Sequence, residues 1–137
     1  MHLPDLIPVG LSASKSRVVT PVSTVKRRVA SLPAVYATPN MSWCMEMVAT
    51  ELIAPRLPAG WVSVGTGVAV EHPAATPVGF EITVTARVTA VSTSRITFEL
   101  EAQDGVELAG KGTHTRAPSA LERFLAGVER KAQRGGG

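Results

Sequence analysis

The alternation of apolar and polar residues over Gly79–Val91 constrains the fold more than any other feature of the chain. Its apolar members occupy every second position: Phe80, Ile82, Val84, Ala86, Val88 and Ala90. A period of two is typical of a strand with one buried face. The same pattern at Arg95–Gln103 follows Ser92-Thr93-Ser94 and predicts a hairpin. A third strand is expected at Glu107–Arg116, after the turn residues Asp104-Gly105, which favours a three-stranded antiparallel meander.

Two more strands and a helix are predicted upstream of this meander. Trp61–His72 should be a strand whose valines face the same side as His72: Val62, Val64, Val68 and Val70. Arg17–Val29 is rich in β-branched residues, and Pro21 restricts it to an edge, a bulge or the start of a strand. Between these segments, Met41–Ala54 is too long and too rich in Met, Ala and Leu for a strand. Apolar residues lie on nearly all of its sides, which predicts a buried helix.

A second, amphipathic helix is expected at Ser119–Lys131, followed by a flexible tail at residues 132–137. Its apolar residues recur at helical spacing: Leu121, Phe124, Leu125 and Val128. The order of the elements favours an α+β fold of the hot-dog type, in which a curved antiparallel sheet of about five strands wraps around one long central helix. Such a sheet leaves an edge strand unpaired, so we expect a homodimer.

Length and composition favour a single domain over residues 1–137. The chain is 45% hydrophobic and 18% charged, which excludes wholesale disorder. Cys44 is the only cysteine, so no internal disulfide can form, as is usual for cytoplasmic proteins. No apolar run approaches the roughly 20 residues that a membrane span needs. We therefore expect a cytoplasmic protein without a membrane partner.

Positive charge is concentrated at the two ends of the chain. Residues 1–30 hold five basic residues and one acidic residue, and residues 116–137 hold five and two. Residues 31–115 hold four basic and eight acidic residues. Basic ends would suit a phosphorylated ligand, such as nucleic acid or a nucleotide-based cofactor, although ordinary solubility explains them equally well. Aromatic residues do not interleave with the basic ones, so nucleic acid is not the expected partner.

A polar stripe runs along the predicted buried helix. Ser42, Glu46 and Thr50 lie at i, i+4 and i+8, and Thr38 extends the stripe back by one turn. A buried, unpaired carboxylate is costly, so Glu46 must be paired, protonated or next to a wet cavity. The alternative is that nothing covers Glu46 and that Thr38 is only a hydroxyl at the start of the helix.

His72 is the expected partner of this stripe, because it lies on the parity that should face the helix. A hydroxyl, a carboxylate and an imidazole can together activate a nucleophile or a water. The alternative is a strand-end histidine beside a proline turn. His114 is a second candidate, on one parity with Arg116, but no short His/Asp/Glu spacing predicts a metal site. Gly65 and Gly67 leave room either for a close approach to the backbone or for a bulge.

Several short motifs match one known family. They are Tyr36-Ala37-Thr38, Cys44-Met45-Glu46, Gly65-Thr66, His72 with Ala74-Ala75-Thr76-Pro77, and Asp104-Gly105 with the GKGTHTR run of Gly110–Arg116. Through them the chain resembles the fluoroacetyl-CoA thioesterase family of hot-dog proteins over roughly residues 32–130. The resemblance implies a catalytic set of Thr38, Glu46 and His72, at separations of 8 and 26 residues that look the same as in the family. It also implies ligand-side roles for the Gly65 backbone and for Arg116. We expect Leu32, Tyr36 and Ser42 to contact the substrate as well.

The polar residues and the resemblance together lead to the hypothesis of an acyl-CoA thioesterase acting on a short-chain, fluoroacetyl-CoA-like substrate. His72 and Glu46 would activate Thr38 or a water for attack on the thioester carbonyl, and the choice between Thr38 and Glu46 as nucleophile stays open. CoA enters only as part of the substrate, so no cofactor is expected. Two other functions stay open: an acyl-CoA hydratase or dehydratase of the same fold, and a non-catalytic dimer that binds acyl thioesters.

Overall fold

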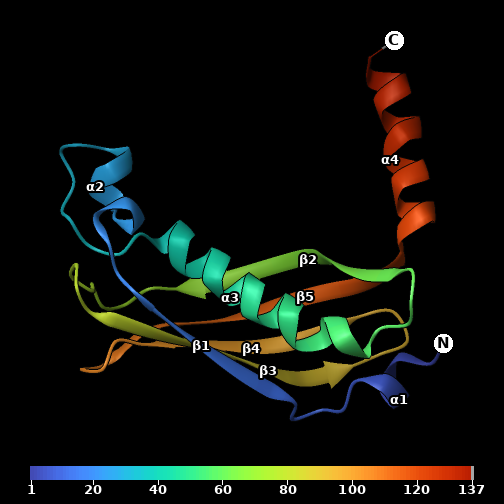
Figure 1. Ribbon diagram of the computed structural model, residues 1–137, viewed down its shortest axis with the longest axis horizontal. Helices are drawn as coiled ribbons and strands as arrows, with labels where there is room; N and C mark the ends of the chain where they lie inside the picture. The colour runs from blue at the N-terminus through green and yellow to red at the C-terminus, as the bar shows by residue number, and fades with distance from the viewer. Residues whose placement is uncertain (137) are drawn as a thin grey trace.

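A five-stranded antiparallel sheet with one long helix across it forms the body of the protein (Figure 1). The computed structural model describes residues 1–136. The sheet order is β1–β3–β4–β5–β2, with β1 at Ser12–Val18, β2 at Trp61–Glu71, β3 at Glu81–Val91, β4 at Ile96–Gln103 and β5 at Leu108–Ala120. The helices are α1 (Leu3–Leu6), α2 (Val25–Arg28), α3 (Thr38–Ile53) and α4 (Leu121–Gly135), with 3-10 turns at Pro21–Ser23 and Ala54–Arg56. The predicted α+β architecture, with its central helix and C-terminal helix, is confirmed. None of the helices in residues 1–136 combines the length and the apolar character of a membrane span.

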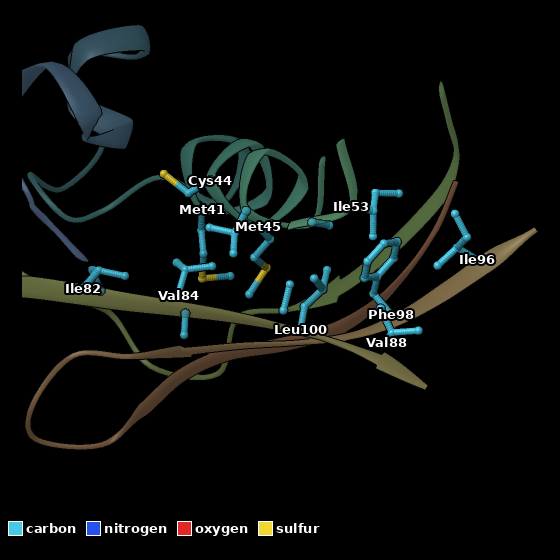
Figure 2. Packing of buried hydrophobic residues seen from close by; sticks show 14 of the residues in the cluster. Met41, Cys44, Met45, Ile53, Ile82, Val84, Val88, Ile96, Phe98 and Leu100 are labelled. Atoms are coloured by element: carbon cyan, nitrogen blue, oxygen red, sulfur yellow. The ribbon is translucent and has the colours of Figure 1, made fainter. Parts of the chain in front are cut away.

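The hydrophobic core fills the space between α3 and the sheet face that it crosses (Figure 2). Its main members are Met41, Cys44, Met45, Val48, Ala49 and Ile53 of α3, Ile82, Val84, Ala86 and Val88 of β3, and Ile96, Phe98, Leu100 and Ala102 of β4. The sheet residues are those that alternation predicts, except that Phe80 precedes β3 and Ala90 follows a bulge, and both are exposed. Each large apolar side chain buried here stabilises the fold by roughly 1.5–3 kcal/mol. The core therefore fixes which side of α3 faces the sheet.

The first strand lies earlier in the chain than predicted. β1 spans Ser12–Val18, whereas the sequence pattern favoured Arg17–Val29. Pro21 begins a 3-10 turn, because it has no backbone N–H to offer a strand. Alternation of apolar and polar residues did not identify β1, because it is an edge strand with mostly exposed side chains. Backbone pairing with β3 holds it, together with hydroxyl contacts such as Ser14 Oγ to Thr85 Oγ1 at 2.7 Å.

The C-terminal helix begins and ends later than predicted. β5 continues to Ala120 through its pairing with β2, so the helix expected at Ser119–Lys131 begins only after that residue. α4 then runs to Gly135, so residues 132–135 of the tail predicted to be flexible are helical. Residue 137 lies outside the described part of the chain. Figure 1 shows α4 projecting away from the sheet.

β2 contains a bulge that reverses the alternation expected of it. The pairing with β5 shifts between Gly65 and Gly67, which leaves Thr66 as an extra residue. Residues opposite each other in an antiparallel pair share a face. Odd-numbered residues of β2 therefore face α3 before the bulge, and even-numbered residues face it after the bulge. The residues of β2 that face α3 are Ser63 and Gly65 before the bulge and Val68 and Val70 after it. His72, which directly follows β2, faces the same side. The prediction that Val62 and Val64 share this face is wrong, because one inserted residue inverts the pattern.

Helix α3 is covered on one side rather than all round. Trp43 is 60% exposed, so the expectation of a helix buried on nearly all sides is wrong. Ser42, Glu46 and Thr50 are half-buried along the flank of the helix that faces β2. β2 is itself an edge strand, and its Val68 is 44% exposed. The polar stripe thus lies beside an edge of the sheet that has no neighbouring strand in the described residues.

A buried set of hydrogen bonds holds the segment before α3 against the loop after β2. The backbone N–H of Tyr36 donates to the Thr76 carbonyl at 2.8 Å, and the Thr76 hydroxyl donates to Asp104 Oδ2 at 2.9 Å. Asp104 Oδ1 also accepts the backbone N–H groups of Val106 at 3.0 Å and Glu107 at 2.9 Å. Thr76 and Asp104 are both buried. The turn between β4 and β5 therefore helps to fix where α3 begins.

Replacing Asp104 with Asn should destabilise the protein in a pH-dependent way. The backbone N–H groups, first that of Glu107 and then that of Val106, hold the pKa of Asp104 below its usual value. Loss of this charge-assisted acceptor should lower the free energy of unfolding by about 1 kcal/mol at pH 7. The difference from wild type should shrink as the pH falls below about 4 and through the lowered pKa of native Asp104, because wild-type Asp104 then becomes protonated as well.

Urea unfolding followed by tryptophan fluorescence between pH 3 and pH 7 would measure this difference. Glu107→Gln is the matched control, since it removes one negative charge from the same turn but keeps the backbone N–H. Equal stability of Asp104→Asn and wild type across the whole pH range would contradict the assignment.

Candidate functional site

Two residues of the predicted catalytic set meet where α3 begins. Thr38 is the first residue of α3, and His72 directly follows β2. Thr38 Oγ1 lies 2.8 Å from His72 Nδ1. Thr38 is exposed while His72 is half-buried, so solvent or a substrate can reach the hydroxyl. This is the geometry in which an imidazole can take a proton from a hydroxyl.

The second ring nitrogen of His72, Nε2, lacks a hydrogen-bond partner within residues 1–136. Burial lowers the pKa of His72, which favours the neutral ring at neutral pH. A neutral ring that accepts the Thr38 proton at Nδ1 carries its own hydrogen at Nε2. Nε2 is buried and has no hydrogen-bond partner within residues 1–136. A group that accepted this hydrogen would remove the cost of an unpaired buried donor.

Glu46 does not lie with this pair but with Gly65 and Arg116. A Cβ atom built on Gly65 would be 3.8 Å from Glu46 Oε1 and 3.4 Å from Arg116 Nη1. Burial lowers the pKa of Arg116, and the Glu46 carboxylate opposes that shift. Ser42 Oγ donates to Glu46 Oε2 at 3.4 Å, so the helix itself orients the carboxylate. The predicted residues Ser42, Glu46, Gly65 and Arg116 therefore form one group.

The two groups are separated along both elements that carry them. Thr38 and Glu46 are eight residues apart in α3, which corresponds to about 12 Å along the helix axis. Gly65 and His72 are seven residues apart along β2, which corresponds to about 20 Å. Burial is the cause of the lowered pKa of His72, whereas the charge of Glu46 acts on Arg116 and His114. A single protomer thus holds the Thr/Glu/His set as two separate parts.

Leu32 and Tyr36 lie apart from the Glu46 group. Tyr36 is buried, and its hydroxyl donates to Cys44 Sγ at 3.5 Å. Burial, and then the contact with Cys44, raises the pKa of Tyr36. Tyr36 and Cys44 line a small cavity with Val84 of β3, on the opposite flank of α3 from Glu46. Leu32 is 40% exposed in the segment between α2 and α3. Substrate contact by these two residues stays a prediction.

His114 and Ser63 complete the Glu46 group, and sequence reasoning gave them little or no weight. His114 Nδ1 lies 2.7 Å from the Gly67 carbonyl, and His114 Nε2 lies 3.1 Å from Arg116 Nη1. Arg116 donates from Nε to Ser63 Oγ and from Nη2 to the Ser63 carbonyl, both at 2.8 Å. The shared parity of His114 and Arg116 on β5 was a usable signal. Ser63 gave none, because only the bulge in β2 turns it toward Arg116.

The described residues contain no group of three His, Cys, Asp or Glu side chains placed to hold a metal ion. The chemistry available to the site is that of its side chains and of backbone N–H groups. A neutral imidazole beside an exposed hydroxyl can act as a general base. A buried guanidinium facing a carboxylate can stabilise negative charge on a substrate. This combination suits attack of a nucleophile on a carbonyl carbon.

Comparisons with known proteins were made for both the sequence and the fold. The family model described as fluoroacetyl-CoA-specific thioesterase matches residues 19–118. The fluoroacetyl-CoA thioesterase of Streptantibioticus cattleyicolor is 39% identical over 137 residues, which are 96% of this chain and 99% of the relative.

Two solved structures extend the comparison. A mutant of the fluoroacetyl-CoA-specific thioesterase in complex with fluoroacetate and CoA superposes with a TM-score of 0.78 at 38% identity, over 86% of this chain and 99% of that chain. A hot-dog-like protein from Thermanaerovibrio acidaminovorans superposes with a TM-score of 0.89 at 26% identity, over 93% and 95% of the two chains. The family match and the near-complete coverage of the relative agree with each other, and the chain belongs to the fluoroacetyl-CoA-specific thioesterase family of hot-dog proteins.

Proposed function

We propose that this protein is an acyl-CoA thioesterase that hydrolyses a short-chain acyl thioester. The observation that carries the proposal is the 2.8 Å contact between Thr38 Oγ1 and His72 Nδ1 at the exposed start of α3. Membership of a thioesterase family supports it, as does a relative that was crystallised with fluoroacetate and CoA. These relationships do not favour the hydratase or non-catalytic alternatives.

In the proposed reaction, His72 Nδ1 takes a proton from Thr38 or from a water beside it. The oxygen attacks the thioester carbonyl, and the C–S bond breaks to release CoA as a thiol once a proton reaches the sulfur. When a water attacks, the carboxylic acid forms directly. When Thr38 attacks, the acyl group is left as an ester on Thr38 Oγ1, and a water then hydrolyses this ester to release the acid and restore the hydroxyl. Backbone N–H groups in the first turn of α3 stabilise the oxyanion, although Pro39 contributes none. Arg116 and the Gly65 backbone contact the acyl group.

A homodimer through β2 completes the catalytic set in this proposal. β2 is an edge strand of 11 residues with an exposed middle, and such an edge is a ready template for another strand. Two copies of β2 paired antiparallel about Ala69, with Val68 of one protomer opposite Val70 of the partner subunit, bring His72 of one protomer to Gly65 of the partner subunit across the bulge. Glu46 and Arg116 of the partner subunit then lie beside Thr38 and His72. Each site takes its hydroxyl and imidazole from one chain and its carboxylate and guanidinium from the other.

The remaining parts of the proposal concern the substrate and its setting. CoA acts only as part of the substrate, and no cofactor takes part. The basic segments at residues 1–30 and 116–137 attract the phosphates of CoA. The enzyme works in the cytoplasm, with neither nucleic acid nor a membrane as a partner.

Substitutions in the catalytic set should abolish thiol release. Free thiol would be measured with a panel of short acyl-CoAs that includes acetyl-CoA and fluoroacetyl-CoA. Thr38→Ala, Glu46→Gln and His72→Ala should each lower kcat by about 100-fold or more, because each removes one member of the proposed catalytic set. Glu51→Gln is the control for Glu46→Gln, since Glu51 is an exposed carboxylate on the same helix that contacts Lys15. Near-normal turnover by the three variants, or conversion of enoyl-CoA without thiol release, would reject the proposal.

The pH dependence should report His72 as the base. Burial lowers its pKa from the usual 6.5, so the neutral ring persists below that pH. The plot of kcat/KM against pH should therefore fall on the acidic side with a midpoint below 6.5. A midpoint above 6.5, or an unchanged acidic limb in the residual activity of His72→Ala, would show that another group titrates.

Mixing two inactive variants should restore activity if each site is shared between chains. Glu46→Gln and His72→Ala would be unfolded together and refolded so that the protomers combine at random. Half of the dimers are then mixed, and each mixed dimer has one complete site, so about a quarter of wild-type activity should return. Light scattering would confirm the dimer. An absence of recovery in a mixed dimer would place both groups of a site in one chain.

A further inference from the structure

His114 is held in a single protonation state by the two groups that it contacts. Its side chain is 1% exposed and stacks on Phe98, with ring centroids 5.9 Å apart. The Gly67 carbonyl can only accept a hydrogen bond, so the 2.7 Å contact requires a hydrogen on His114 Nδ1. The Arg116 guanidinium can only donate, so the 3.1 Å contact requires a bare His114 Nε2. Both contacts are satisfied only by the neutral ring with its hydrogen on Nδ1.

The surroundings of His114 favour that neutral form, chiefly because they bury the ring. Burial lowers its pKa, and the positive charge of Arg116 lowers it further, against the opposite effects of the Gly67 hydrogen bond and of Glu46. The titratable neighbours are Arg116 from β5 and Glu46 from α3. β2 and β4 contribute Gly67 and Phe98, which do not titrate.

The same contacts fix the guanidinium of Arg116 at all three of its nitrogen atoms. Ser63 accepts from Nε and Nη2, and His114 accepts from Nη1. The ion pairs within 4.0 Å among the described residues do not include Glu46 with Arg116. Arg116 Nη1, His114 Cε1 and Glu46 Oε1 instead surround the space above Gly65, at 3.4, 3.4 and 3.8 Å from a Cβ built there. The guanidinium is thus aimed at this space by neighbours rather than by the carboxylate.

We propose that His114 is a positioning residue, which in its neutral form holds the Arg116 guanidinium over Gly65 so that it faces Glu46 and the bound acyl group. In this role His114 acts through Arg116 and not directly on the reacting atoms. Its bond to the Gly67 carbonyl also ties the guanidinium to the bulge in β2, so the donor and the strand backbone move together. The catalytic consequence rests on the proposed thioesterase function, whereas the positioning of Arg116 does not.

Two substitutions separate the two bonds of His114. Asn places an amide N–H near the position of Nδ1, so His114→Asn keeps the donor to Gly67 and loses the acceptor for Arg116. Gln places an amide oxygen near the position of Nε2, so His114→Gln keeps the acceptor for Arg116. Both variants lose the ring that stacks on Phe98, so the loss of stacking cannot explain a difference between them. Thr115→Val is a further control, because it removes the Thr66–Thr115 hydrogen bond on the other face of β5.

The mobility of Arg116 tests the positioning directly and does not need turnover. Nitrogen NMR of the arginine Nε–H group should show a restricted guanidinium in wild type, in His114→Gln and in Thr115→Val. It should show a mobile guanidinium in His114→Asn. Equal mobility in the Asn and Gln variants would overturn the proposal. If His114→Asn does not fold, the NMR chemical shift of His114 Nε2 is measured in wild type and in Arg116→Met instead. This chemical shift must differ between the two proteins for the proposal to stand.

Steady-state thiol release then tests the catalytic consequence. His114→Asn should lower kcat/KM by about tenfold or more, as expected for the loss of one charge-assisted hydrogen bond, and His114→Gln should stay close to wild type. In the Arg116→Ala background, His114→Asn should have no further effect, because the two residues act in series. A full additive loss in that background would show that His114 acts independently of Arg116. A wild-type protein that releases no thiol would reject the thioesterase proposal and leave the mobility measurement to decide this one.

Discussion

Helix α3 has to bury an apolar side against the sheet while it carries a row of polar side chains along the flank beside β2. The packing of Met41, Met45 and Ile53 on the sheet fixes the rotation of the helix, and this rotation directs the polar row toward the edge strand. Because a helix advances by about 1.5 Å per residue, residues along one row meet different parts of β2. Thr38 reaches His72 after the end of the strand, and Glu46 reaches Gly65 and Arg116. The division of the site into two parts follows from this packing.

Most of the sheet could be predicted because a single physical signal determined it. β3 and β4 bury one face under α3 and expose the other, so period-two alternation identified them and their inward residues. β1 could not be found in this way, since its stability comes from backbone pairing and hydroxyl contacts at an edge, which leave no apolar period. The end of β5 was missed for a related reason. Its last residues pair with β2, and a local helical pattern at Ser119 does not include that distant partner.

The site residues could be named from the sequence, but their grouping could not. The spacing of Thr38, Ser42 and Glu46 placed them on one flank of a helix, which the structure bears out, yet spacing does not say which strand residue each one meets. The bulge at Thr66 adds one residue to β2 and so brings Ser63 and Gly65 to the same side as His72. Periodicity assumes an uninterrupted strand, so it placed Val62 and Val64 there instead. The contacts of His114 could not be predicted either, because they involve a carbonyl and a guanidinium that only the folded strands bring together.

The extra residue in β2 has a consequence for how this chain can vary. Gly65 and His72 are seven residues apart, an odd number, and they face the same side because the bulge at Thr66 offsets it. A loss of the bulge with every residue kept would turn the imidazole to the opposite side of the sheet from Thr38, and so would a deletion that kept the bulge. Deletion of Thr66 itself would restore regular alternation and leave Gly65 and the imidazole on one side. Substitutions at the outward-facing positions would leave the orientation of both residues unchanged. The bulge and the number of residues between Gly65 and His72 are therefore expected to change together in any variant that keeps both residues facing α3.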